Sequence, residues 1–131
     1  MVIFIDTSAI LPLLNASDPD HSAANDTLRR HIDSAQFVTH NYVVLETTAL
    51  LQRRFGMRGV RAFVERLLPS ISVVWVDTAR HDRAMTSLLA RGRRKASLVD
   101  RVSFDVMREL GTQTAFAYDS DFRREGFALL D

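Results

Sequence analysis

The sequence predicts an α/β protein in which a mostly parallel β-sheet lies between two layers of helices. Short runs of β-branched and aromatic residues alternate with longer segments in which apolar residues recur every three or four positions. The first run, Val2–Ile5, is apolar throughout, which is typical of a strand buried on both faces. The 131 residues are 47% hydrophobic and 25% charged, enough for one core, so we expect a single domain over residues 1–131.

The first half of the chain is expected to hold two strands and four helices. Thr7 and Ser8 follow the first strand and are candidate N-caps for a short helix that ends at Leu14. Gly56 lies between two segments of helical periodicity and is a plausible helix stop. The remaining elements expected here are a strand over 36–39 and helices over 22–33, 43–55 and 58–68.

The second half continues the alternation of strands and helices. Residues 71–76 are almost all apolar and predict a second buried strand, in which Trp75 packs in the core. Ser97 is a candidate N-cap for a helix that Gly111 stops. The other elements expected here are helices over 78–90, 97–110 and 121–125 and strands over 115–118 and 127–130.

The residue types exclude several classes of protein. Since the chain has no cysteine, it has no disulfide framework, no thiolate zinc site and no cysteine nucleophile. The N-terminus lacks the basic stretch and long apolar run of a signal peptide, and no apolar run is long enough to cross a bilayer. We therefore expect a cytoplasmic protein with no membrane partner.

Acidic residues follow several of the predicted elements at corresponding positions. Asp6 ends the first strand, and Asp119 and Asp121 follow the strand near the C-terminus. Asp100 and Glu46 lie in the first turns of two predicted helices. Because ligands of open α/β sheets bind at the carboxyl ends of the strands, these carboxylates are expected to converge at one edge.

Such a cluster has a definite chemistry. Crowded carboxylates repel each other unless a cation neutralises them, and oxygen ligands without cysteine favour Mg²⁺ or Mn²⁺. These ions catalyse phosphodiester chemistry by activating water, with one or two ions in the site. Each acid alone has a structural alternative. Asp100 stands at capping-box spacing from Ser97, and Glu46 has the surroundings of a half-exposed helix acid. The remaining acids are candidate turn residues; they are Asp6, Asp119 and Asp121.

The basic residues suit a phosphate-bearing substrate. Of the 17 basic residues, only Lys95 is a lysine, and arginine presents a planar fork of donors that matches phosphate. A basic stretch directly upstream of Asp100 is therefore a candidate RNA-binding loop, with a solvated surface loop as the alternative. Its members are Arg91, Arg93, Arg94 and Lys95.

The ordered set of acids resembles that of PIN-domain nucleases, and within them the VapC-type toxins of bacterial type II toxin–antitoxin pairs. The resemblance spans nearly the whole chain. It is carried by Asp6-Thr7-Ser8 after the first strand, Glu46 early in a helix, SLVDRVSF over 97–104, and AYDSDF over 117–122 followed by Gly126.

This resemblance implies a PIN-like three-layer fold and a Mg²⁺- or Mn²⁺-dependent endoribonuclease that cleaves RNA with metal-activated water. By position, the implied catalytic acids are Asp6, Glu46, Asp100, Asp119 and Asp121. Asp6, Asp100 and Asp119 would bind the metal, and Asp121 would assist or replace Asp119. The hydroxyl group of Thr7 or Ser8 would support Asp6 by hydrogen bonding.

The resemblance also implies partners: an RNA substrate (tRNA, rRNA or mRNA), a cognate antitoxin protein and a second copy of the chain in a homodimer. The alternative function is a PIN-like module that binds RNA or protein without catalysis.

Overall fold

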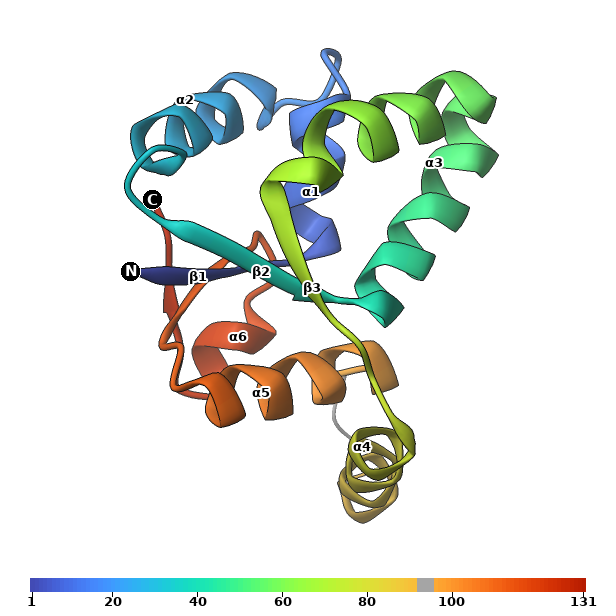
Figure 1. The fold of residues 1–131 in the computed structure, drawn as a ribbon, viewed down its shortest axis with the longest axis vertical. Coiled ribbons are helices and arrows are strands. Elements are labelled where there is room, and N and C mark those ends of the chain that lie inside the picture. The colour runs from blue at the N-terminus through green and yellow to red at the C-terminus, as the bar shows by residue number, and fades with distance from the viewer. Residues whose placement is uncertain (92–95) are drawn as a thin grey trace.

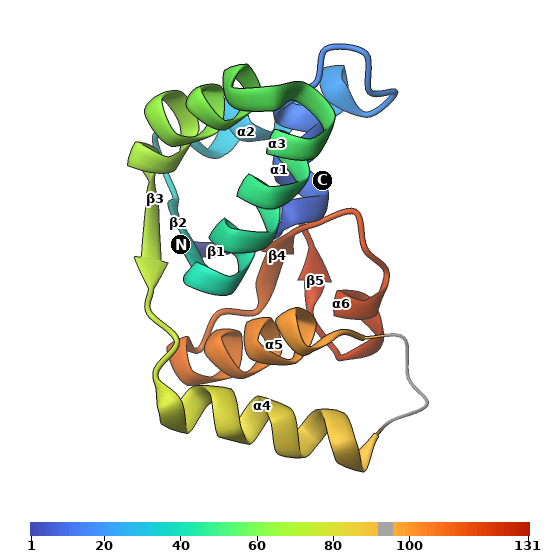
Figure 2. The same cartoon turned by 90° about the vertical axis from the view of Figure 1, so that its right-hand side faces the viewer.

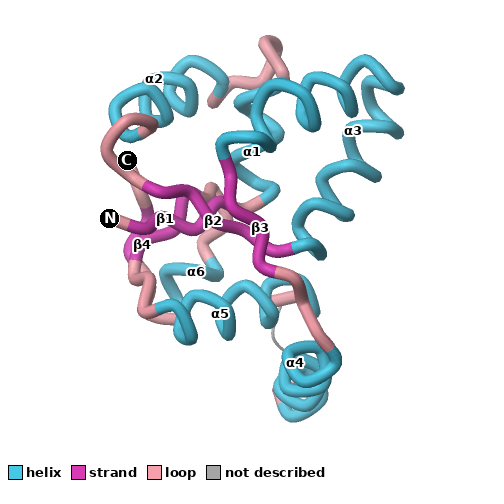
Figure 3. Tube along the Cα trace, in the orientation of Figure 1, coloured by secondary structure: helices cyan, strands magenta, loops and turns pink. Residues whose placement is uncertain are grey.

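The computed structural model describes residues 1–91 and 96–131, and within these residues five parallel strands form one sheet between two helix layers (Figure 1). The strands are β1 Val2–Ile5, β2 Gln36–His40, β3 Ile71–Val74, β4 Thr114–Phe116 and β5 Ala128–Leu129. The helices α1 Thr7–Leu14, α2 His21–His31 and α3 Asn41–Ala62 cover one face, and α4 Thr78–Ala90, α5 Leu98–Leu110 and α6 Asp121–Arg124 lie on the other. The predicted three-layer α/β/α sandwich is confirmed, and Figure 3 shows its central sheet between the helices.

The order of the strands creates a topological switch point at the carboxyl ends of two of them. Across the sheet the order is β3-β2-β1-β4-β5. The chain therefore adds β2 and β3 on one side of β1 and then returns to add β4 and β5 on the other side of β1. β1 continues into α1 and β4 leads into α6, which lie on opposite faces (Figure 2). The carboxyl ends of β1 and β4 therefore flank a topological switch point, where ligands bind in folds of this class.

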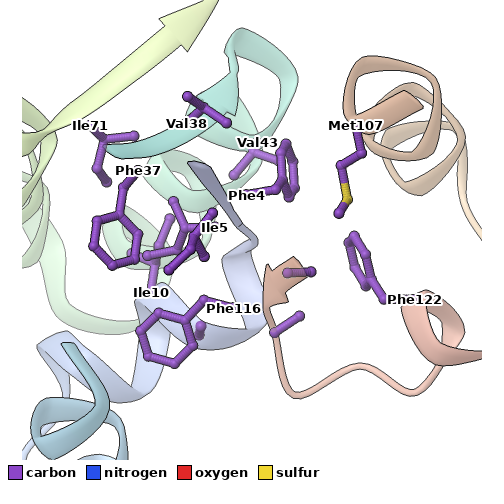
Figure 4. Packing of buried hydrophobic residues seen from close by; sticks show 14 of the residues in the cluster. Phe4, Ile5, Ile10, Phe37, Val38, Val43, Ile71, Met107, Phe116 and Phe122 are labelled. Atoms are coloured by element: carbon purple, nitrogen blue, oxygen red, sulfur yellow. The ribbon is translucent and has the colours of Figure 1, made fainter. Parts of the chain in front are cut away.

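β1 is buried on both faces, as the sequence predicts. Phe4 and Ile5 are fully buried and lie on opposite sides of the sheet (Figure 4). The ring of Phe4 lies 6.0 Å from that of Phe122 in α6, while Phe37 and Phe116 pack 6.5 Å apart near Ile5. Packing on both faces fixes the position of the end of β1.

Gly56 redirects α3 instead of ending it. The backbone of Gly56 has φ 65° and ψ −161°, which breaks the helical path within a segment that continues to Ala62. A side chain is unfavourable at that positive φ, so glycine suits the kink. The predicted helix over 58–68 is correspondingly the end of α3 followed by a π-helical turn at Phe63–Leu67 and a 3₁₀ turn at Leu68–Ser70.

The prediction of a buried strand over 71–76 is wrong in its burial and length. β3 ends at Val74, and Trp75, which the sequence places in the core, is 72% exposed. The physical reason is position, because β3 is the outermost strand and the helix layers cover it incompletely. Within the described ranges, no helix combines the length and the apolar character that a membrane crossing requires.

Candidate active site

Asp6 lies where β1 ends and α1 begins, and it is buried. Its Oδ2 accepts hydrogen bonds from the backbone N–H of Ser8 at 3.1 Å and from Ser8 Oγ at 2.7 Å. Asp6 is therefore the N-cap of α1, and the predicted caps Thr7 and Ser8 are already inside the helix. The helix begins at Thr7 because Asp6 is the last residue with extended φ and ψ angles.

The two hydroxyl groups after Asp6 have different partners. Ser8 Oγ donates to Asp6 and accepts a hydrogen bond from the backbone N–H of Tyr118 at 2.9 Å, so it links the ends of β1 and β4. The Thr7 hydroxyl lies 2.9 Å from Thr47 Oγ1 of α3 and does not contact Asp6. Ser8 thus orients the acid, whereas Thr7 joins α1 to the helix that carries Glu46.

Asp100 lies in the first turn of α5 and combines two roles. Its Oδ2 accepts a hydrogen bond from the Ser97 backbone N–H at 3.0 Å, and Ser97 Oγ accepts one from the Asp100 N–H at 3.2 Å. This is a complete capping box, which orients the Asp100 side chain. Among the described residues, no hydrogen bond involves its other carboxylate oxygen, so the cap does not prevent Asp100 from binding a ligand.

Asp119 and Asp121 come from the segment between β4 and α6 and lie beside Asp100. Asp119 Oδ1 accepts a hydrogen bond from the Asp121 N–H at 2.9 Å, and Arg124 donates to Asp121 Oδ1 at 2.7 Å. One carboxylate oxygen from each of Asp100, Asp119 and Asp121 lies within 4.8 Å of the others. The predicted metal ligands Asp100 and Asp119 are therefore brought together, with Asp121 rather than Asp6 as the third member of this group.

The effects on the pKa of Asp6 indicate that Asp6 and Glu46 belong to the same acidic site. Burial raises the pKa of Asp6 to about 6, against the lowering effect of its hydrogen bonds from Ser8. The carboxylates of Asp100 and Glu46 raise this pKa further, which places both of them near Asp6. Glu46 is half-buried on α3.

Asp100 connects the two parts of the site. Burial raises its pKa, as do the neighbouring carboxylates of Asp119 and Asp121, against the hydrogen bonds from Ser97. All five predicted acids are thus linked by mutual repulsion at the carboxyl edge of β1 and β4; they are Asp6, Glu46, Asp100, Asp119 and Asp121. Oxygen donors of this kind, without cysteine, fit a hard divalent cation, which would relieve the repulsion.

The predicted RNA-binding stretch lies mostly outside the described residues, which exclude Arg93, Arg94 and Lys95. Arg91, at the end of α4, is half-exposed, and its Nη1 lies 3.5 Å from Glu125 Oε1. Part of its charge is therefore already compensated by a carboxylate of the same chain.

His40 caps the helix that carries Glu46, and it was not among the predicted site residues. Its Nδ1 accepts the backbone N–H groups of Tyr42 at 3.2 Å and Val43 at 3.3 Å, so His40 is the N-cap of α3. Because Nδ1 accepts, Nε2 carries the proton and donates to Ser103 Oγ of α5 at 2.8 Å. Burial lowers the pKa of His40 to about 3, which keeps the ring neutral. The available sequence signal was the place of His40 between the end of the predicted strand over 36–39 and the start of the predicted helix over 43–55.

Replacing His40 by alanine is expected to lower the free energy of unfolding by about 1–3 kcal/mol, because the cap and a buried hydrogen bond are both lost. Urea titration of the two proteins measures this. His31→Ala at the end of α2 is the control and should have a much smaller effect, since His31 is only partly buried and bonds a carbonyl within its own helix. Equal midpoints for wild type and His40→Ala would contradict the assignment.

Comparison with known proteins places this geometry in context. The chain matches the family described as PIN domain over residues 3–128. Two relatives from Mycobacterium tuberculosis strains (CDC 1551 / Oshkosh and ATCC 25618 / H37Rv), both named 23S rRNA-specific endonuclease VapC20, are 39% identical over 128 residues, or 96% of this chain and 95% of theirs.

Solved structures agree in fold. The crystal structure of M. tuberculosis VapC20, described as a Sarcin-Ricin loop cleaving toxin, superposes with a TM-score of 0.85 at 37% identity over 96% of both chains. VapBC2 from Rickettsia felis, bound to a promoter DNA fragment, gives a TM-score of 0.73 at 11% identity over 98% of this chain and 97% of the other. At 11% identity, the similarity to VapBC2 concerns the fold alone.

Proposed function

The chain belongs to the PIN-domain family, and from this premise we propose that it is a Mg²⁺- or Mn²⁺-dependent endoribonuclease, the toxin of a toxin–antitoxin pair. The observation that carries the proposal is the group formed by Asp100, Asp119 and Asp121, whose oxygens lie within 4.8 Å of one another. Asp6 and Glu46 add two further negative charges beside it. Without a cation, such a cluster costs stability, so its presence favours a metal-dependent function.

Each acid has a part in this proposal. Asp100 and Asp119 would hold the cation, with Asp121 as a third ligand whose oxygen lies within 4.8 Å of theirs, and Asp6 and Glu46 would add negative charge beside it. When bound, a divalent cation supplies a Lewis acid that activates water and stabilises charge on the phosphate. The chain itself supplies orientation: Ser8 holds the Asp6 carboxylate, Ser97 holds that of Asp100, and the backbone N–H of Asp121 holds that of Asp119.

We propose ribosomal RNA as the substrate. This rests on the relative named 23S rRNA-specific endonuclease, which is 39% identical to the chain over almost its whole length. Purified protein incubated with ribosomes and Mg²⁺ is expected to cut the large rRNA at one position, which mapping of new 5′ ends identifies. Chelation with EDTA should stop cleavage, and excess Mg²⁺ or Mn²⁺ should restore it.

Two results would count against this function. Cleavage that continues in EDTA contradicts the metal mechanism. Binding of RNA with no turnover at any Mn²⁺ concentration favours the alternative of a non-catalytic PIN-like module.

The remaining partners belong to the same proposal. A toxin nuclease acting on ribosomes works in the cytoplasm and requires a cognate antitoxin to hold it inactive. A homodimer is also proposed, and the large exposed apolar side chains of Trp75 (72%) and Leu89 (76%) offer surface for such contacts. We also propose that residues 1–131 form one nuclease domain.

A further inference from the structure

A buried ion pair lies between the two segments that carry the acidic group. Arg101 Nη1 is 3.4 Å from Glu125 Oε1, and the side chains are only 3% and 9% exposed. Arg101 directly follows Asp100 in α5, and Glu125 ends α6, four residues after Asp121. The pair therefore joins α5 to the end of α6, one residue after Asp100 and four residues after Asp121.

The acidic group depends on the relative position of these two helices. Asp100 belongs to α5, whereas Asp119 and Asp121 belong to the segment that enters α6. Besides the ion pair, α5 and α6 meet through Phe104 and Phe122, whose rings pack edge to face at 5.2 Å. An apolar contact is not directional, whereas the ion pair limits how far the end of α6 can move from the first turn of α5.

Glu125 is the centre of a wider cluster of positive charge. Besides Arg101, it accepts Arg108 Nη2 at 2.9 Å and Arg91 Nη1 at 3.5 Å, so it ties the end of α4 and two turns of α5 to α6. Within the described ranges, Nε and Nη2 of Arg101 are buried and have no hydrogen-bond partner. The buried charge of Arg101 thus relies on Glu125, and separating the pair leaves that charge uncompensated.

We propose that Arg101 is a positioning residue for the metal site, acting through Glu125 to hold Asp119 and Asp121 against Asp100. The inference rests on the proposed metal-dependent function and adds to it a residue whose side chain pairs with Glu125 and joins the two segments that carry the acidic group. Groups that hydrogen-bond to the ligands of a metal site commonly change its affinity by about 10- to 100-fold when they are replaced, and Arg101, which pairs with Glu125 rather than with a ligand, should act at the lower end of that range.

The direct test is Mn²⁺ affinity, measured by isothermal titration calorimetry on the full chain. Arg101→Met removes the charge and keeps the length, and it is expected to weaken Mn²⁺ binding by about tenfold or more. Cleavage should fall more at limiting than at saturating Mn²⁺, because the variant weakens metal binding while it retains all the acids. Arg101→Lys keeps the charge and should recover part of the affinity. Glu125→Gln should weaken binding as Arg101→Met does. Because it leaves the buried charge of Arg101 uncompensated, it is the more destabilising of the two changes, and Arg101→Met, which removes that charge, is the variant that keeps the fold.

Arg80→Met is the matched control. Arg80 bridges α4 to Glu109 at the other end of α5, with Nε 3.0 Å from Glu109 Oε2. Its loss removes a helix-to-helix arginine–glutamate pair that is more exposed than the Arg101 pair and lies away from the acids, and it should leave Mn²⁺ affinity unchanged. If Arg101→Met and Glu125→Gln bind Mn²⁺ as tightly as wild type, or lose no more affinity than Arg80→Met, the positioning role is overturned. A wild-type chain that binds no Mn²⁺ contradicts the proposed metal-dependent function itself, and this inference with it.

Discussion

Replacing Asp100 by asparagine is expected to abolish RNA cleavage while the chain remains folded. The change removes one negative oxygen donor from the group formed with Asp119 and Asp121. Because a metal ion contributes several kcal/mol to transition-state stabilisation, the single-turnover rate should fall by about 10³-fold. The asparagine side chain can still accept the Ser97 N–H, so the start of α5 is preserved.

The Asp100→Asn variant also tests whether growth arrest requires nuclease activity or only expression of the chain. Induced alone in bacteria, the wild-type chain should arrest growth and Asp100→Asn should not, whereas wild type coexpressed with its antitoxin should grow. Asp105→Asn is the control, since Asp105 is a partly buried acid of the same helix that lies outside the acidic group. It should cleave as wild type does. Cleavage by Asp100→Asn at the wild-type rate would refute the assignment of the site.

Replacing Asp6 by asparagine is expected to stabilise the metal-free chain at neutral pH. The pKa of Asp6 is about 6 in the folded chain against a reference value of 3.8, so the folded state favours the protonated acid. Ionised Asp6 therefore lowers stability at high pH, and this cost disappears as the pH falls from about 7 to about 4. The difference between the two pKa values corresponds to about 3 kcal/mol at most.

Thermal or urea unfolding in EDTA, from pH 4 to pH 8, measures this effect. The stability gained by Asp6→Asn should be largest above pH 7 and should vanish near pH 4. His40 acts in the opposite direction, because its lowered pKa reduces stability as the pH falls, but it does so equally in both proteins. Added Mn²⁺ should stabilise wild type more than the variant at pH 7.5. A difference between the proteins that does not vary with pH would contradict the role of Asp6 charge.

The sequence by itself determined the local elements and the edge at which the acids meet. The capping box of Ser97 and Asp100 and the left-handed Gly111, with φ 67°, bound α5 close to the predicted ends, because both signals act over a few residues. The convergence of Asp6 with Asp100 was also predictable, since parallel strands place their carboxyl ends at one edge. These features depend on the order of residues and on chain geometry alone.

Only the tertiary structure decided how distant segments meet. It showed that Ser8 and not Thr7 contacts Asp6, that β3 is an exposed edge strand, and that Arg101 pairs with Glu125 across two helices. Each of these depends on distances between side chains far apart in sequence. Such distances, and the burial that raises the pKa of Asp6, result from packing of the whole core, which no local pattern of residues encodes.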